Sequence, residues 1–97
     1  PPVTMTSPLM AAVATRNVSM VRHLLTNGGG DPNEKTMDGC SLLFHAATMG
    51  QLDVLEVLLE AGAKVDERDR EGWTPLMAAA HWNHVECMRA LLAAGAN

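Results

Sequence analysis

His81, His84 and Cys87 form the pattern His-x-x-His-x-x-Cys, which has the residue types of a metal site. Imidazole nitrogens and thiolates are the ligands that zinc prefers, and this spacing could place them along one helix. A helix boundary is predicted at Asn83, however, and it assigns His81 and His84 to different helices. We therefore favour a structural role for these side chains, and we expect neither a metal nor another cofactor.

A second arrangement with chemical potential is Cys40, a thiol nucleophile, with His45 nearby in sequence as a base. Nucleophilic catalysis needs a third group that orients the base, and the sequence offers none for His45. Cys40 is also predicted to lie in an exposed turn. We therefore interpret it as a surface thiol without a catalytic role.

Two connecting segments contain residue types that bind phosphate or calcium. The glycines at 28–30 lack the preceding strand and the following lysine of a phosphate-binding loop, so a helix end followed by an inserted turn explains them better. The acidic segment 66–71 lacks the spacing of a calcium-binding loop. Its negative and positive side chains are interspersed, as in a solvated hairpin: Asp66, Glu67, Arg68, Asp69, Arg70 and Glu71. With no converging acid, base and nucleophile, we expect that the chain is not an enzyme.

Composition narrows the class of partner. The chain has 97 residues and a net charge of -4, and its basic residues are scattered, which argues against nucleic acid and anionic membranes. No apolar run approaches the roughly 20 residues that span a bilayer, so no membrane insertion is expected. Two cysteines are too few for a disulfide framework. We expect reduced thiols and an intracellular location, in the cytoplasm or the nucleus.

The elements that must position these residues are internal repeats. Leu43 aligns with Leu76 at an offset of 33 residues, and Leu9 aligns with Leu43 at an offset of 34. In each copy a hydroxyl residue precedes a short first helix, predicted near 8–15, 42–49 and 75–82: these caps are Ser7, Ser41 and Thr74. Each second helix has one apolar stripe that should be buried, as in Val85, Met88, Leu91 and Leu92. Gly29, Gly62 and Gly95 are predicted to end these helices, and the segments 31–39 and 64–72 to form exposed turns.

These residues resemble the ankyrin repeat: Gly72-Trp73-Thr74-Pro75-Leu76 opens a first helix, Ala79-Ala80 lies within it, and Leu91-Leu92 and Gly95-Ala96-Asn97 follow. The resemblance implies an all-α ankyrin-repeat solenoid of three helix-turn-helix repeats joined by β-hairpin-like turns. It covers one domain, 1–97, with repeats of about 2–34, 35–68 and 69–97. The chain ends inside an expected turn after a weakly charged helix, so we expect it to be a fragment of a longer ankyrin-repeat protein.

Departures from the family pattern fall at equivalent places in the repeats. Arg16 and Asn83 replace the glycine between the two helices of a repeat, where the middle copy has Gly50. Large apolar residues replace the usual histidine of the first helix: Met10, Phe44 and Met77. His84 stands where the family often has histidine, which implies a structural role for it.

The resemblance also implies a function, the binding of a partner protein or peptide on the hairpin tips and the exposed side of the first helices. The matching positions in the second and third repeats are Met37, Asp38, Cys40, Thr48, Met49, Arg70, Glu71, Trp73, His81 and Trp82. Those in the first repeat are Val3, Thr4, Thr6, Ala14 and Thr15. Because tryptophan is enriched at interface hot spots, Trp73 and Trp82 suggest an apolar anchor groove with a charged rim.

Two alternatives stay open at this point. The chain could be a regulatory or targeting segment of a larger enzyme or channel, whose activity lies outside these residues. In a narrower version, Trp73 and Trp82 form the walls of a cage for a methylated lysine, held by cation–π attraction. Further ankyrin repeats of the same chain are another potential neighbour.

Overall fold

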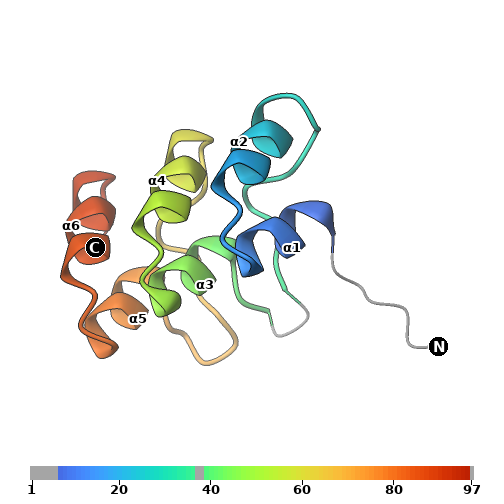
Figure 1. Cartoon of the computed structure of the whole chain (residues 1–97). Helices are drawn as coiled ribbons and strands as arrows, with labels where there is room; N and C mark the ends of the chain where they lie inside the picture. The colour runs from blue at the N-terminus through green and yellow to red at the C-terminus, as the bar shows by residue number, and fades with distance from the viewer. Residues whose placement is uncertain (1–6, 37–38, 97) are drawn as a thin grey trace.

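The computed structural model describes residues 7–36 and 39–96 of the chain. These residues form six helices, arranged as three antiparallel pairs in two layers (Figure 1). The first helices α1, α3 and α5 form one layer, and the second helices α2, α4 and α6 form the other. Their bounds are Pro8–Ala14 (α1), Val18–Thr26 (α2), Leu42–Met49 (α3), Leu52–Glu60 (α4), Pro75–His81 (α5) and Val85–Ala93 (α6).

Local capping chemistry fixes where the first helices begin. The side-chain oxygens of Ser7, Ser41 and Thr74 accept backbone N–H groups from Met10, Phe44 and Met77 at 3.0, 3.0 and 3.3 Å. Each bond satisfies an N–H that has no partner inside the helix. The predicted starts of all three helices are therefore confirmed, and the ends of α1 and α5 fall one residue earlier than expected.

The turn between the two helices of each repeat contains a residue in the left-handed conformation. These residues are Arg16, Gly50 and Asn83, with φ of 58°, 69° and 61°. Two of the three repeats thus use a residue with a side chain where the backbone favours glycine. Asparagine tolerates this conformation better than most residues, which explains its place at 83.

The turn at Asn83 supplies a stability test. Asn83→Gly should leave the free energy of unfolding within about 0.5 kcal/mol of the parent, because glycine adopts a positive φ readily. Asn83→Val should lower it by about 1–2 kcal/mol, because a β-branched residue is strained there. Urea denaturation followed by circular dichroism measures both variants. Equal effects of the two substitutions would show that the backbone conformation at residue 83 does not determine the change in the free energy of unfolding.

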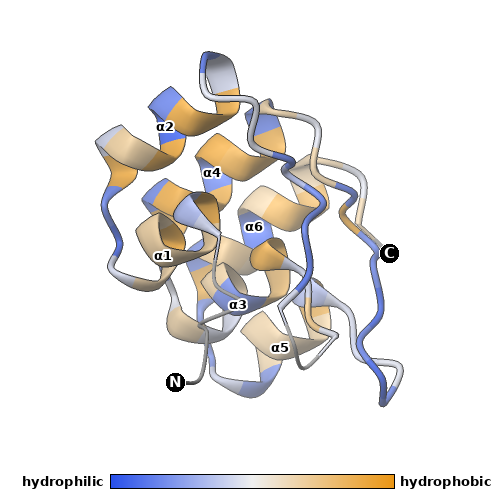
Figure 2. Ribbon diagram, turned by 90° about the vertical axis from the view of Figure 1, so that its right-hand side faces the viewer, coloured by the Kyte–Doolittle hydropathy of each residue, from blue (hydrophilic) through white to orange (hydrophobic). Residues whose placement is uncertain are grey.

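The core lies between the two layers and is centred on the middle repeat. Leu43, Leu55 and Leu58 are fully buried there, and Val13 and Leu91 extend the core into the first and third repeats. The polar residues gather in the connecting segments, as the hydropathy colours show (Figure 2). Helix α3 packs extensively on α5 but much less on α1. The first helices therefore approach each other unequally along the stack.

The predicted apolar stripe is only partly buried in the third repeat. Leu92 and Val85 are 53% and 44% exposed, which corrects the expectation that they belong to the core. The equivalent of Leu92 in the middle repeat is Leu59, which is half-buried beside α6. Leu92 is exposed because no described helix packs beyond it. Helical periodicity identified the residues of one face without showing how much of that face a neighbour covers.

A histidine joins the second and third repeats. The Nε2–H of His84 donates to the carbonyl of Thr48 at 3.1 Å, across 36 positions of sequence. A Cβ placed on Gly50 would lie only 2.6 Å from the His84 ring, so the imidazole rests directly against that glycine. The structural role expected for His84 is thereby explained by a hydrogen bond between repeats.

Polar contacts join neighbouring helices and turns of the stack. Two ion pairs, Arg16–Asp53 at 3.2 Å and Arg22–Glu60 at 3.3 Å, connect the first and second repeats, and Lys35–Glu67 at 3.0 Å connects the turns at the two ends of the second repeat. The side-chain oxygen of Asn33 also accepts the backbone N–H of Lys64 at 2.7 Å. Most of these groups are well exposed, and such pairs contribute only about 0–1 kcal/mol each. They align neighbouring turns more than they stabilise the fold.

The segments between repeats are turns closed by backbone hydrogen bonds. Lys35 and Ser41 form an isolated antiparallel bridge, and the N–H of Asp69 donates to the carbonyl of Trp73 at 2.9 Å. In the described ranges these contacts do not extend into strands. Gly62 and Gly95 directly follow the C-caps of α4 and α6 with φ of 93° and 99°, as expected for residues that end these helices. Gly29 also has a positive φ, 73°, but lies two residues beyond the C-cap of α2, which ends at Thr26. None of the described helices is long and apolar enough to cross a bilayer.

Candidate binding groove

Two adjoining hollows lie along the layer of first helices and the turns that precede them. The first has a volume of about 380 Å³ and lies between α1 and α3, where these helices pack loosely. Its walls are Met10, Val13, Ala14, Thr36, Cys40, Leu42, Phe44, His45 and Thr48. The second has a volume of about 300 Å³, and its walls are Phe44, Thr48, Asp69, Glu71, Trp73, Ala78, His81 and Trp82. Because Phe44 and Thr48 line both, we treat the two hollows as one feature, the groove.

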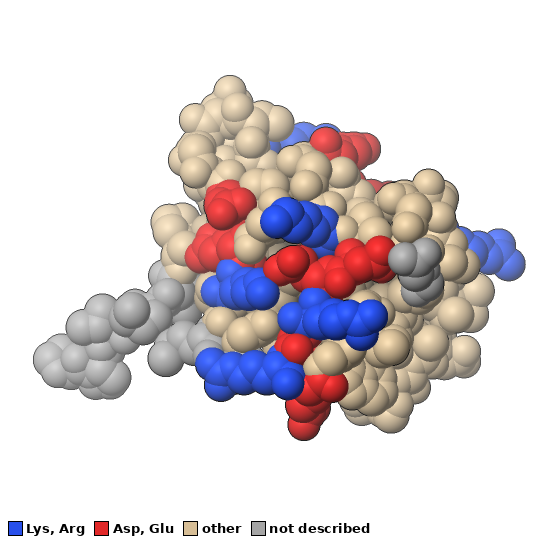
Figure 3. Space-filling view, turned by 180° about the vertical axis from the view of Figure 1, so that it is seen from behind, with Lys and Arg blue, Asp and Glu red and all other residues tan. Residues whose placement is uncertain are grey.

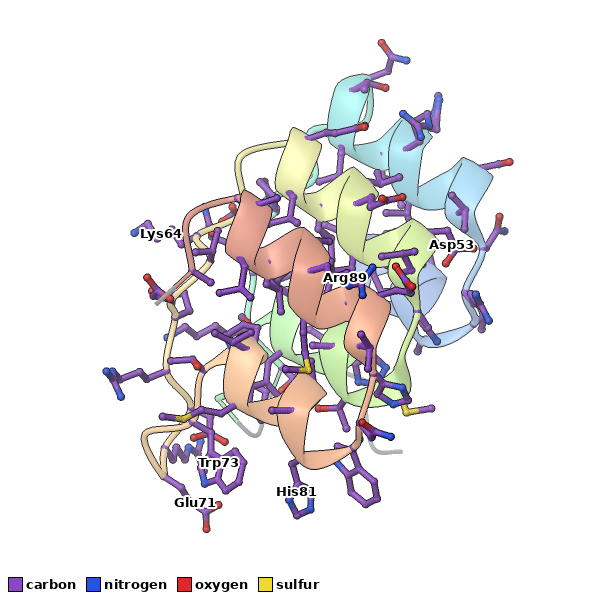
Figure 4. The ribbon with its side chains drawn as sticks, turned by 90° about the vertical axis from the view of Figure 1, so that its left-hand side faces the viewer. Asp53, Lys64, Glu71, Trp73, His81 and Arg89 are labelled. Atoms are coloured by element: carbon purple, nitrogen blue, oxygen red, sulfur yellow. The ribbon has the colours of Figure 1, made fainter. Side chains whose placement is uncertain are left out.

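Aromatic rings dominate the second hollow. The His81 imidazole makes T-shaped contacts with both indoles, with its centroid 5.7 Å from that of Trp73 and 4.9 Å from that of Trp82. The planes are nearly perpendicular in both pairs, at 87° and 88°, which is a favourable geometry for aromatic contacts. Figure 4 shows Trp73 and His81 pointing out of the same end of the molecule as Glu71. Three rings thus form a continuous aromatic row.

A hydrogen-bonded turn holds Trp73 in this row. One carboxylate oxygen of Asp69 accepts the backbone N–H groups of Trp73 at 2.8 Å and Glu71 at 2.9 Å. Arg68 donates to the carbonyl of Gly72 at 3.0 Å, and Gly72 has a φ of 86° that few other residues adopt. Thr74 then caps α5 directly after the tryptophan. The indole at 73 therefore projects from a backbone fixed on both sides.

The first hollow is mainly apolar, with a thiol and an imidazole in its wall. Burial lowers the pKa of His45, which favours the neutral imidazole. Cys40 is half-buried, which corrects the expectation that it lies in an exposed turn. Cys40 lines the hollow between α1 and α3, so residues of the neighbouring repeat cover part of it, and within the turn its carbonyl accepts the N–H of Thr36 at 2.8 Å. The hollow therefore suits an apolar group better than a charged one.

A family model for ankyrin repeats matches residues 9–97, with three copies of the repeat. The chain belongs to the ankyrin repeat family. No curated protein is significantly similar to it in sequence. Ankyrin repeats are generally protein–protein interaction modules, and the family is typically not catalytic. The all-α fold expected from the sequence is confirmed.

The groove, formed by the two hollows, brings together most of the described residues that the sequence proposed for binding. Those in the second hollow are Thr48, Glu71, Trp73, His81 and Trp82, and Ala14 and Cys40 join Thr48 in the first. Met49 is 57% exposed but lines neither hollow. Arg70 lies over Gly39, because a Cβ on that glycine would be 3.0 Å from its Nε. Met37, Asp38, Val3, Thr4 and Thr6 lie outside the described residues.

The sequence interpretation missed several residues of the groove, among them Met10, Phe44 and His45. A signal for two of them was present, since Met10 and Phe44 replace the usual histidine of the first helix. A large apolar residue at a position that varies between repeats indicates a surface for interaction with another molecule, rather than for packing between repeats. Phe44 matters most, because it lies where the two hollows meet.

The three candidate metal ligands of the sequence are engaged in other contacts in the ankyrin fold. Cys87 is 1% exposed, His84 bonds to Thr48, and His81 packs between the indoles. Over residues 7–36 and 39–96 there is no group of three or more potential ligands that could hold a metal ion. Burial first, and then the nearby Glu56 carboxylate, raise the pKa of the Cys87 thiol. Its environment disfavours the thiolate that a zinc ligand or a nucleophile needs.

The two thiols should therefore differ in reactivity. In the folded protein, Cys40 should react with iodoacetamide at least about tenfold faster than Cys87, because reaction requires access and thiolate. Mass spectrometry of the two cysteine peptides over time gives both rates. In urea the rates should converge, which controls for intrinsic reactivity. Equal rates in the folded state would contradict the burial of Cys87 and the accessibility of the first hollow.

Proposed function

We propose that this ankyrin domain binds a segment of a partner protein in the groove, without catalysis. The observation that supports this most directly is the junction of the two hollows at Phe44 and Thr48. The junction gives an extended surface that crosses from α1 to α5. A surface of this shape suits a chain segment better than a compact small molecule.

The exposure of the two tryptophans supports the same proposal. Trp73 and Trp82 are 37% and 57% exposed, although each would bury a large apolar area against a partner. Solvent-exposed apolar clusters of this kind mark interaction sites on protein surfaces. Tryptophan also loses little conformational entropy on binding and is enriched at hot spots. We infer that the aromatic row supplies most of the binding free energy.

The charge pattern supports a protein partner over nucleic acid. Basic and acidic side chains are interleaved on the face of the molecule opposite to that in Figure 1, without an extended area of one sign (Figure 3). A phosphate backbone requires a continuous basic surface. The proposed partner is therefore a protein or peptide, and we place the interaction inside the cell, in the cytoplasm or the nucleus, where thiols stay reduced.

Site-specific photo-crosslinking tests which face the partner occupies. Benzoylphenylalanine is placed at His81, in the groove, or at Met20, which is 44% exposed on α2. The two variants are incubated with lysate, irradiated and compared by mass spectrometry. The proposal predicts a protein crosslinked from position 81 and absent from position 20. A partner crosslinked from position 20 alone would overturn it.

The alternatives from the sequence use the same surface. A regulatory or targeting role within a larger enzyme or channel would still need the groove to hold another protein segment. A methyl-lysine cage is less well supported, because His81 lies between the two indoles that would form its walls. A true cage would leave that space for the ammonium group.

A further inference from the structure

We propose that the second hollow of the groove receives an arginine side chain of the partner, while the first receives an apolar side chain. This inference rests on the proposed function and specifies the chemistry of the bound segment. The features behind it are the aromatic row, the sign of the charge around it and the contrast between the two hollows.

The aromatic walls provide a surface for a cation. The faces of indole rings attract cations, and arginine in particular stacks on tryptophan. Trp73 and Trp82 line the hollow and are both exposed to solvent at the groove. Because Trp73 and Trp82 are 37% and 57% exposed, part of each indole is open to a ligand despite the contacts with His81.

The charges that line the second hollow are negative. Its walls include Asp69 and Glu71 but no lysine or arginine. Asp69 is held by the two backbone N–H groups of its turn, so its position is fixed, while Glu71 is exposed at the tip. A positively charged group that enters the hollow is therefore close to two carboxylates and three rings.

The basic residues of the same turn do not line the second hollow. Arg68 donates to the Gly72 carbonyl at 3.0 Å, and Arg70 lies over Gly39 of the preceding turn. Figure 4 shows Lys64 and Arg89 well away from Glu71, Trp73 and His81. Among the described residues, the lining of the second hollow therefore contains two carboxylates and no basic side chain.

The geometry favours arginine over lysine. A planar guanidinium can stack on an indole and still donate to a carboxylate in its plane, whereas an ammonium group is a compact, strongly hydrated charge. The first hollow has apolar walls in Met10, Leu42 and Phe44. Since Phe44 borders both hollows, the arginine and the apolar side chain come from one short segment of the partner.

A random peptide library displayed on phage tests the inference with a defined probe. Peptides are selected on the folded domain, and the tightest one is synthesised with a fluorescent label. Its affinity is measured by anisotropy with arginine, with citrulline, which is neutral and nearly the same shape, and with trimethyl-lysine. We expect arginine to be enriched among the selected peptides and its replacement by citrulline to weaken binding about tenfold.

Variants of the domain provide matched controls. Glu71→Gln should weaken binding of the arginine peptide about threefold and leave the citrulline peptide unchanged. Glu56→Gln makes the same chemical change at an exposed position of α4 and should change neither affinity. An effect of Glu71→Gln on both peptides alike would contradict a direct contact with the guanidinium.

The outcomes separate this inference from the proposed function. Peptides that lose binding with Trp73→Ala, but tolerate citrulline, would overturn the arginine assignment and retain the groove. Tighter binding of trimethyl-lysine than of arginine would also overturn it and would favour the cage. Selected peptides that are insensitive to both Trp73→Ala and Trp82→Ala would overturn the groove itself.

Discussion

The double substitution Trp73→Ala and Trp82→Ala should weaken partner binding by roughly 100-fold or more, with little change in stability. Truncation of one hot-spot aromatic typically weakens binding by about 2 kcal/mol or more, and the two rings line the same hollow. Both indoles are substantially exposed, so their removal takes little apolar area out of the core. Anisotropy with the library-selected peptide and thermal melting measure the two effects.

Met20→Ala is the control for the loss of an exposed apolar side chain. Met20 is 44% exposed on α2, in the layer of second helices, and its replacement should alter neither binding nor melting. The backbone bonds that join Asp69 and Trp73 survive in the alanine variant, because they involve main-chain atoms of residue 73. Loss of the helical signal in the double variant would instead show that the indoles stabilise the stack.

Gly50→Ala should destabilise the domain by about 2–3 kcal/mol, which is a large part of the 5–15 kcal/mol expected for a small protein. Two separate effects add. The positive φ of 69° strains any residue with a Cβ, by about 1–2 kcal/mol. The new Cβ would also meet the His84 ring at 2.6 Å and displace its hydrogen bond to Thr48, a further loss of about 1 kcal/mol. Urea denaturation followed by circular dichroism measures the sum.

A double-mutant cycle with His84→Ala separates the two effects. Without the imidazole, Gly50→Ala should cost only about 1–2 kcal/mol, since the backbone strain alone is left. If Gly50→Ala has the same effect in both backgrounds, the contact with His84 is not part of its cost. The cycle thus measures how much the histidine contributes to the joint between the second and third repeats.

The helices could be predicted closely because the signals that define them are local. Ser7, Ser41 and Thr74 cap helices through bonds to residues three positions later, and glycines end α4 and α6 by their own backbone preference. These interactions depend on short stretches of sequence. They repeat with the period of the chain, so each copy supports the interpretation of the others.

The groove could be predicted only in part, because it depends on distances between repeats. Trp73, His81 and Trp82 are among the positions proposed from the sequence, and they do line one hollow. The first hollow exists because α1 and α3 pack loosely, and no local pattern encodes that spacing. For the same reason Cys40 was expected in solvent, while Leu92 was expected in the core. Sequence periodicity assigns a face to a residue, but the neighbouring repeat decides its exposure.

The two indoles of the second hollow also give the domain an optical property. The chain contains two tryptophans and no tyrosine, so nearly all of its intrinsic fluorescence originates in the groove. A ligand that covers Trp73 and Trp82 changes the polarity around the only strong fluorophores in the protein. Occupation of the groove is therefore visible in the emission spectrum of the unlabelled domain, with no signal from the rest of the fold to obscure it.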